Sequence, residues 1–453
     1  MDAALIWPWI LAWGAAIALP LTLHSSKVRR AGQVGLVGLG FAILVLQAGS
    51  PPPWRLLCAS LLFLYLMKGA VLLGFSSEEV RKTSPLPYLL FFSIWPGMAI
   101  EGLRVRRAAN SEEVQGFGRG LVFLVLGTAL VILDALSLDR LQPIATAWLC
   151  VAGLLLAVHF GISEILTALV RLAGRPVSPL FDKPERSESL DDFWSRRWNL
   201  PFVEMGRRLF LRPIVRRLGP KTGLVAMFLI SGLLHEMALS YPVGKGWGLP
   251  TLYFLIQATG VLIQKKLQVR SRLWTWAFIL LPLPVLFHPA FLLELPYKFV
   301  VNLHGALNSH PLGWYLNIVL WILGVSQLLV LAASRQVPEK LNWKEELPRL
   351  GSFNRKLMWT YGAFVVFTIL GFSAMTFALH DELLRGDRVA AVFALFAASY
   401  WLLRLGFDTF YFDHGDWPKG AEFVVGHALL NALFAFLVFG YGSFAAINLL
   451  KSI

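Results

Sequence analysis

Long uninterrupted apolar runs dominate this sequence, many of about twenty residues, the length that an α-helix needs to cross a bilayer core. Hydrophobic residues make up 57% of the 453 positions and charged residues only 15%, too few to cover a water-soluble protein of this size. We therefore predict an all-α, polytopic transmembrane helical bundle of about 11–12 spans. The predicted spans are 4–23, 31–48, 54–75, 119–138, 143–170, 222–241, 248–264, 273–288, 312–333, 357–379, 388–410 and 421–448.

Two other apolar segments are less suited to a full crossing. Residues 85–100 read PLPYLLFFSIWPGMAI, a short run that three prolines interrupt. Residues 288–300, HPAFLLELPYKFV, are similarly short. Both are predicted to be re-entrant or interfacial segments.

The distribution of basic residues predicts an orientation. If the N-terminus lies outside, the predicted cytoplasmic segments hold 32 Lys and Arg residues and the opposite side holds 7. The net charge of +14 then reflects membrane topology and no nucleic-acid partner is expected. Arg outnumbers Lys by 27 to 14, as is common in GC-rich bacterial genomes. The expected location is thus a bacterial inner membrane.

The sequence offers little for a metal site or a disulfide framework. Cys58 and Cys150 both lie within apolar runs, where packing is the expected role. The segment 407–416, FDTFYFDHGD, contains suitable ligand types, but their spacing fits no metal-binding pattern. We predict no metal.

The largest predicted cytoplasmic segment, residues 171–221, begins with a proline-rich linker. Its second half alternates apolar residues at near-helical spacing with arginines between residues 202 and 218. Such a basic amphipathic stretch is suited to lie at a membrane surface.

His235 and Glu236 stand side by side inside the predicted span 222–241. Ionisable groups in hydrocarbon are unfavourable unless they are paired or line a site. One interpretation is that they tie helices together. The other is a functional site, in which His235 takes a proton as a general base. Ser231 lies one helical turn before His235, on the same face.

A second motif, SLDDFWSRRWN, occupies residues 189–199. Its residues of interest are Phe193, Trp194, Arg196, Arg197, Trp198 and Asn199. Trp and Arg also gather at any membrane interface, which would account for most of the motif without a function. An interfacial belt does not account for Asn199, which is followed by the chain-redirecting Pro201.

In combination, the two motifs resemble the membrane-bound O-acyltransferase (MBOAT) family. The shared features are the order of the aromatic–Arg–Asn motif, the basic stretch and the intramembrane His-Glu pair 36 residues after Asn199. The first motif is most similar to the wax synthase branch and more distantly to acyl-CoA:diacylglycerol acyltransferases. The resemblance covers roughly residues 50–305 and includes IWPGM at 94–98.

This resemblance implies roles for single residues. His235 matches the catalytic histidine of the family and Asn199 its asparagine partner. Ser231 and Glu236 match positions that line the reaction chamber, although Glu236 could instead hold structure, because neighbouring helix positions point about 100° apart. The aromatic–Arg segment, Phe193 to Trp198, matches a stretch that helps bind acyl-CoA.

The implied reaction moves a fatty acyl group from acyl-CoA, entering from the cytoplasmic side, to the hydroxyl of a long-chain alcohol. Acyl-CoA is then a cosubstrate, with no permanently bound cofactor. The other expected partners are the lipid alcohol and membrane lipid, and an oligomer is compatible with the sequence. Diacylglycerol, sterol or isoprenoid alcohols are alternative acceptors. A transporter that relays protons through His235 and Glu236 is the alternative from another class.

The expected organisation has three parts. Residues 1–50 are N-terminal spans, and residues 51–333 form an MBOAT-like acyltransferase core that includes the segment 171–221. Residues 334–453 add three spans with no assigned role.

Overall fold

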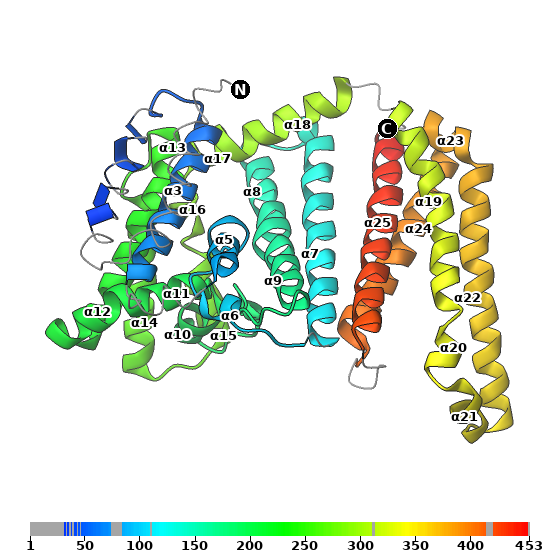
Figure 1. The fold of residues 1–453 in the computed structure, drawn as a ribbon. Helices are drawn as coiled ribbons and strands as arrows, with labels where there is room; N and C mark the ends of the chain where they lie inside the picture. The colour runs from blue at the N-terminus through cyan, green and yellow to red at the C-terminus, as the bar shows by residue number, and fades with distance from the viewer. Residues whose placement is uncertain are drawn as a thin grey trace. The chain divides into compact units, whose positions relative to one another are not determined.

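A computed structural model describes residues 31–32, 34–35, 38, 40–42, 44–45, 47–73, 84–108, 111–309, 313–413 and 420–451. The predicted span 4–23 lies outside these residues, and the span 31–48 lies only partly within them. All regular secondary structure in the described part of the chain is helical (Figure 1), which confirms the all-α prediction.

Eight helices of the described residues are long and apolar enough to cross a membrane. They are Pro52–Leu72, Glu112–Leu136, Pro143–Leu172, Pro220–Val243, Leu316–Lys340, Ser352–Ala378, Arg388–Tyr411 and Phe423–Ile447. Each coincides with a predicted span, so the polytopic membrane bundle is confirmed. The predicted span 248–264 forms one helix, α14 (Leu249–Leu267), which is roughly 28 Å long at 1.5 Å per residue and does not count among the eight.

The predicted span 273–288 and the second short apolar segment, 288–300, form a bent pair of helical stretches. The helical stretches Arg272–Leu286 and Pro289–Leu307 meet at an angle of 71°, as in a broken span or a re-entrant loop. His288 lies at this bend and starts α17 (Pro289–Leu292) as its N-cap.

The chain forms two compact units, both discontinuous in sequence. The first contains the described residues up to 107, together with 142–148 and 175–299. The second contains 108–141, 149–174 and the residues from 300 onward.

The first unit holds the two motifs predicted to carry the site. Its helices are α3 (Pro52–Leu73), α5 (Pro85–Ser93), α6 (Glu101–Arg104), α10 (Leu190–Asp192), α11 (Leu200–Gly206), α12 (Arg212–His235), α13 (Tyr241–Val243), α14, α15 (Arg272–Leu280), α16 (Leu283–Leu286) and α17. Four π-helical turns, η4 (Phe193–Arg197), η5 (Arg207–Leu211), η6 (Glu236–Ser240) and η7 (Leu293–Tyr297), interrupt them.

Helix α12 is two helical pieces joined by a kink. Gly219 has a φ of 84° in the left-handed region that glycine adopts without strain, and Pro220 follows it. The kink separates the basic stretch 212–218 from the apolar part that begins at Pro220. Glycine also allows α12 to approach α14, because a Cβ on Gly232 would lie 2.7 Å from Cα of Thr251. The amphipathic stretch and the membrane span are thus parts of one bent element.

The first short apolar segment is fixed by a buried lysine. Helix α5 has nine residues, fewer than a crossing needs. Lys68 of α3 is only 1% exposed, and its Nζ donates to the carbonyl oxygens of Phe91 and Trp95 at the C-terminal end of α5. The ammonium also lies 4.8 Å from the centre of the Phe91 ring. A cation at this end of a helix complements its dipole.

The second unit is a bundle with its own apolar core. Its long helices are α7 (Ser111–Leu136), α9 (Ser163–Leu172), α19 (Gly313–Ser334), α22 (Ser352–Ala378), α24 (Arg388–Gly406) and α25 (Ala421–Lys451). The last four run side by side in Figure 1, with fully buried Trp401 and Tyr441 between them. Helices α22, α24 and α25 of the expected C-terminal extension thereby share a core with α7 and α19.

Candidate active site

A cavity of about 310 Å³ lies within the first unit. Residues of α12, α14 and the chain from α10 to η5 form its walls. Its apolar lining includes Leu211, Val215, Leu224, Met227, Phe228, Phe254 and Val261. A mostly apolar cavity with a few polar groups is the usual form of a small-molecule site.

Helix α12 contributes a continuous stripe to this cavity. The stripe comprises Pro220, Leu224, Met227, Phe228, Ser231 and His235. Their spacing of three and four residues places them on one helix face. His235 therefore stands at one end of an apolar wall that one helix supplies over roughly 22 Å.

The environment of His235 fixes its proton. Its Nδ1 lies 2.8 Å from the carbonyl oxygen of Ser231. A carbonyl oxygen only accepts, so Nδ1 donates and the other nitrogen, Nε2, keeps its lone pair in the neutral ring. The imidazole also packs on the Phe254 ring of α14, with the ring centres 4.5 Å apart. His235 is thus held in the tautomer that a general base requires.

Asn199 lines the same cavity and has a visible structural role as well. It has a φ of 45°, in the left-handed region that asparagine tolerates better than most residues. Its Oδ1 accepts the backbone N–H of Phe202 at 3.3 Å, so Asn199 is the N-cap of α11. The amide oxygen is thus used by the cap, and the two hydrogens on Nδ2 are the donors that the side chain has left.

Two of the aromatic residues in the first motif line the cavity and one supports them. Trp194 and Trp198 are in the lining. Trp194 donates from Nε1 to Oε1 of Gln257 at 3.2 Å, which orients its indole. Phe193 is 2% exposed and stacks on Trp198 with the ring centres 5.3 Å apart. Phe193 is therefore part of the core behind the cavity wall.

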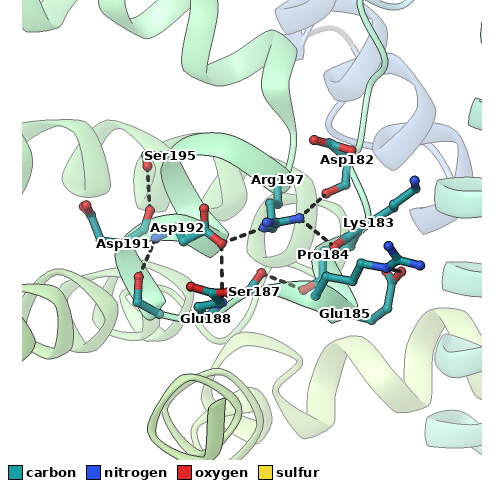
Figure 2. Close-up of polar contacts among 12 residues, drawn as sticks. Asp182, Lys183, Pro184, Glu185, Ser187, Glu188, Asp191, Asp192, Ser195 and Arg197 are labelled. Atoms are coloured by element: carbon teal, nitrogen blue, oxygen red, sulfur yellow. Dashed lines mark hydrogen bonds and ion pairs between the residues drawn. The ribbon is translucent and has the colours of Figure 1, made fainter. Parts of the chain in front are cut away.

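The two arginines of the motif do not line the cavity. Arg197 donates from Nε to Oδ2 of Asp192 at 2.6 Å and from Nη1 to the carbonyl oxygens of Asp182 and Lys183, as Figure 2 shows. The hydrogen bond that Arg197 donates to Asp192 raises the pKa of Arg197 above its ordinary value. Arg196, in contrast, is exposed. Arg197 fastens the proline-rich linker to the motif.

Glu236 also lies outside the cavity lining. It begins the π-helical turn η6 directly after His235, and its side chain is 5% exposed. Its Oε1 accepts the backbone N–H groups of Gly248 and Thr251, both at 3.0 Å, and the Thr251 hydroxyl at 2.8 Å. The carboxylate thereby caps the N-terminus of α14, where a negative charge is favourable.

The polar end of the cavity was not predicted. Asp191, Ser195, Arg207 and Lys265 line it. Lys265 forms an ion pair with Asp191 at 2.9 Å, and the two side chains are 52% and 42% exposed. In the sequence, this end of the cavity is indicated by Lys265 and Lys266, the two lysines near the end of α14. Their position alone does not show that Lys265, and not Lys266, lines the cavity.

The described part of the chain contains no group of three or more His, Cys, Asp or Glu placed to hold a metal ion. The buried Asp408 and His427 of the second unit lie 2.6 Å apart, with Arg404 at 3.4 Å from Asp408. The Asp408 carboxylate is thus held by the contacts to His427 and Arg404.

Comparison with known proteins gives a family for the site-bearing segment. Residues 177–256 match the Membrane bound O-acyl transferase family. This segment contains both motifs, from the proline-rich linker to the start of α14.

The curated relatives agree with that match. The "Probable long-chain-alcohol O-fatty-acyltransferase 2" of Arabidopsis thaliana is 33% identical over 113 residues, which cover 23% of this chain and 32% of the relative. The "Acyl-CoA--sterol O-acyltransferase 1" of the same plant is 34% identical over 100 residues, covering 19% and 29%. The "Long-chain-alcohol O-fatty-acyltransferase" of Simmondsia chinensis is 28% identical over 142 residues, covering 27% and 40%.

The chain thus spans about a third of the length of the first of these relatives. The matched segment carries the cavity-lining histidine, the asparagine cap and the aromatic wall. This segment and these relatives support the membrane bound O-acyl transferase family, and within it the wax synthase-like branch.

Proposed function

We propose that the protein transfers a fatty acyl group from acyl-CoA to the hydroxyl of a long-chain alcohol, with a wax ester and free CoA as products. The observation that carries the proposal is His235, a histidine with its lone pair on Nε2 at the end of an apolar cavity. The names of the relatives supply fatty acyl transfer to a long-chain alcohol, and the name of the sterol acyltransferase supplies acyl-CoA as the donor.

The chemistry requires a base and an oxyanion donor. In the proposed reaction His235 Nε2 takes the hydroxyl proton while the alcohol oxygen attacks the thioester carbonyl carbon. The new C–O bond forms, the C–S bond breaks, and the proton passes from His235 to the departing thiolate. No protein nucleophile or bound cofactor takes part.

Asn199 is the proposed oxyanion donor, with Ser231 as the alternative. Both line the cavity that contains His235. The cap at Phe202 N–H occupies Oδ1 of Asn199 and thereby sets the orientation of its Nδ2 hydrogens. A donor fixed before the reaction stabilises developing negative charge without reorganisation.

The polar and apolar parts of the cavity suit the two halves of acyl-CoA. Lys265 and Arg207 at the polar end can meet phosphate groups, and the α12 stripe can hold an acyl chain. Trp194 and Trp198 would form the wall between them. We place the polar end on the cytoplasmic side of a bacterial inner membrane, in accord with the basic residues of segment 171–221.

The other predicted site residues would act indirectly. Phe193 would support the aromatic wall, Arg197 would hold the motif in place and Glu236 would fix α14. Arg196 is free to contribute positive charge near the polar end, since its side chain is exposed.

The identity of the acceptor is the open choice. The sterol acyltransferase among the relatives favours a sterol as the second candidate. Diacylglycerol and isoprenoid alcohols have the same reacting hydroxyl, and one experiment can compare all four.

The test uses purified protein in detergent micelles with labelled acyl-CoA and a panel of these alcohols. We expect ester with a long-chain alcohol, and a loss of at least 100-fold in rate for His235→Ala, within the range that general-base catalysis contributes. His304→Ala is the matched control, because His304 makes the same 2.8 Å contact to a backbone carbonyl outside the cavity.

Unchanged ester synthesis by His235→Ala would remove His235 from the reaction. If no alcohol yields ester and His235→Ala instead blocks lipid movement across liposomes, the protein is a transporter and the proposal is wrong.

A further inference from the structure

Two buried polar groups outside the cavity have complementary bonding capacity. Oε2 of Glu236 and Nε2 of His288 are fully buried and have no hydrogen-bond partner among the described residues. The two residues are 5% and 1% exposed. Buried polar atoms are almost always hydrogen-bonded, so each such atom points to a partner.

Glu236 offers an acceptor. Its Oε1 already receives three donors from Gly248 and Thr251, which hold the side chain in place. The second oxygen, Oε2, is therefore fixed in position with its lone pairs unused. A carboxylate oxygen in this state requires a donor.

His288 offers a donor. Its Nδ1 accepts the backbone N–H of Phe291 at 3.2 Å, as the N-cap of α17. An accepting Nδ1 carries no proton, so the neutral imidazole carries its hydrogen on Nε2. The unpaired atom of His288 is thus an N–H, the counterpart of the unpaired oxygen of Glu236.

Both groups lie against the same glycine-rich turn, residues 244–248. Gly248 donates its N–H to Glu236, and a Cβ on Gly246 would collide with the His288 ring. Gly246 also has a φ of 80°, so glycine is required there both by the backbone conformation and by the closeness of the His288 ring. Since neither atom has a protein partner, they do not bond each other directly.

A group between them must accept from an N–H and donate to a carboxylate oxygen. A hydroxyl does both, whereas a carbonyl, an amine cation or a second carboxylate cannot. We propose that Glu236 and His288 form a binding site for one hydroxyl group, which accepts from His288 Nε2 and donates to Glu236 Oε2.

Two sources can supply this hydroxyl, a tightly held water molecule or the head of a lipid alcohol. Only the second source rests on the proposed function. In that case the site would hold the acceptor alcohol at Glu236, directly after His235 in the sequence. The two sources predict different responses to added alcohol.

The test is thermal unfolding of the purified protein in detergent, with and without 1-dodecanol and without acyl-CoA. His288→Asn keeps an oxygen for the α17 cap but lacks Nε2, and Glu236→Gln keeps an oxygen for Gly248 and Thr251 but replaces the acceptor. His288→Ala shows the additional effect of losing the cap.

When the shared hydroxyl is bound, as water or as added 1-dodecanol, we expect both single variants to lower the Tm, and the double variant to lower it no further than the worse single variant. Two groups that share one ligand are non-additive in this way. If water is the source, 1-dodecanol changes the Tm of the wild type and His288→Asn equally. If alcohol is the source, the wild type gains in Tm and His288→Asn gains nothing.

Strictly additive losses in the double variant, or single variants that unfold like the wild type, would overturn the site. Acyl transfer plays no part in this measurement. A failed acyltransferase assay with intact non-additivity would therefore refute the proposed function and leave the hydroxyl site standing.

Discussion

His235 donates from Nδ1 to the backbone carbonyl of Ser231, one turn earlier on α12, at a distance of 2.8 Å. The contact uses main-chain oxygen, so it does not depend on the identity of the residue at position 231. The backbone of α12 therefore sets the tautomer of the proposed base, and the Ser231 hydroxyl takes no part in this contact.

Asn199 and Ser231 can be separated as oxyanion donors. Asn199→Asp keeps an oxygen for the α11 cap and tolerates the positive φ, but it loses the Nδ2 hydrogens. We expect its kcat to fall by about 10²–10³, the usual effect of removing one oxyanion donor, with an unchanged Tm. Ser231→Ala should stay within about threefold of the wild type, because its carbonyl still holds His235. The reverse ranking of the two variants would assign the oxyanion to Ser231.

The ion pair between Lys265 and Asp191 predicts that substitutions of its two residues have opposite effects on acyl-CoA binding. Lys265→Gln should raise the KM for acyl-CoA by at least about tenfold, because one charge-assisted contact to phosphate contributes about 1.5–3 kcal/mol. Asp191→Asn should lower the KM about twofold, because it frees Lys265 from an exposed pair worth roughly 0.2–1 kcal/mol. Lys266→Gln is the matched control, since Lys266 does not line the cavity. Equal effects of the two lysine variants would show that only overall charge matters.

Arg196 and Arg197 are adjacent and should behave differently. Arg197→Gln loses the bond to Asp192 and the contacts to two carbonyl oxygens, and we expect the free energy of unfolding to fall by about 1.5–3 kcal/mol. Arg196→Gln should change it by less than about 0.5 kcal/mol, as is usual for an exposed residue. Chemical denaturation in detergent measures both. Similar losses for the two variants would contradict the fastening role of Arg197.

Glu204 of α11 predicts a pH dependence of stability. Burial raises the pKa of its carboxyl above the ordinary value of 4.5, so the folded state holds the proton more tightly than the unfolded state. The stability of the wild type is therefore lost as the pH rises from about 4.5 through the folded pKa. Glu204→Gln does not titrate, so its advantage in Tm should be small near pH 4.5 and grow toward neutral pH. A difference in Tm that is constant with pH would exclude this explanation.

The sequence predicted the parts of the structure that depend on periodicity and hydropathy. The eight spans follow from apolar runs, and the placement of Ser231 and His235 on one face follows from a spacing of four residues. The motif also placed Asn199 and two tryptophans at the cavity. These features are local, so a pattern in the chain is enough to read them.

The remaining features depend on partners outside the helical repeat that carries each residue. Arg197 is fixed by the Asp192 side chain of α10 and by carbonyl oxygens of the linker, which has no periodicity. Glu236 finds its donors at the N-terminus of α14, and the π-helical turn η6 begins at this residue. A π-helical turn departs from the 3.6-residue repeat, so a helical projection of the sequence cannot place the side chains that follow His235.

Lys68 and its two carbonyl acceptors have a consequence for how the chain enters the membrane. The lysine precedes Phe91 and Trp95 in the sequence, so its side chain leaves the ribosome before its acceptors do. A lone ammonium in hydrocarbon is strongly unfavourable, whereas one bonded to two carbonyls at a helix end is not. The burial of Lys68 therefore depends on the segment that follows α3, and we expect α3 and α5 to reach their final positions together.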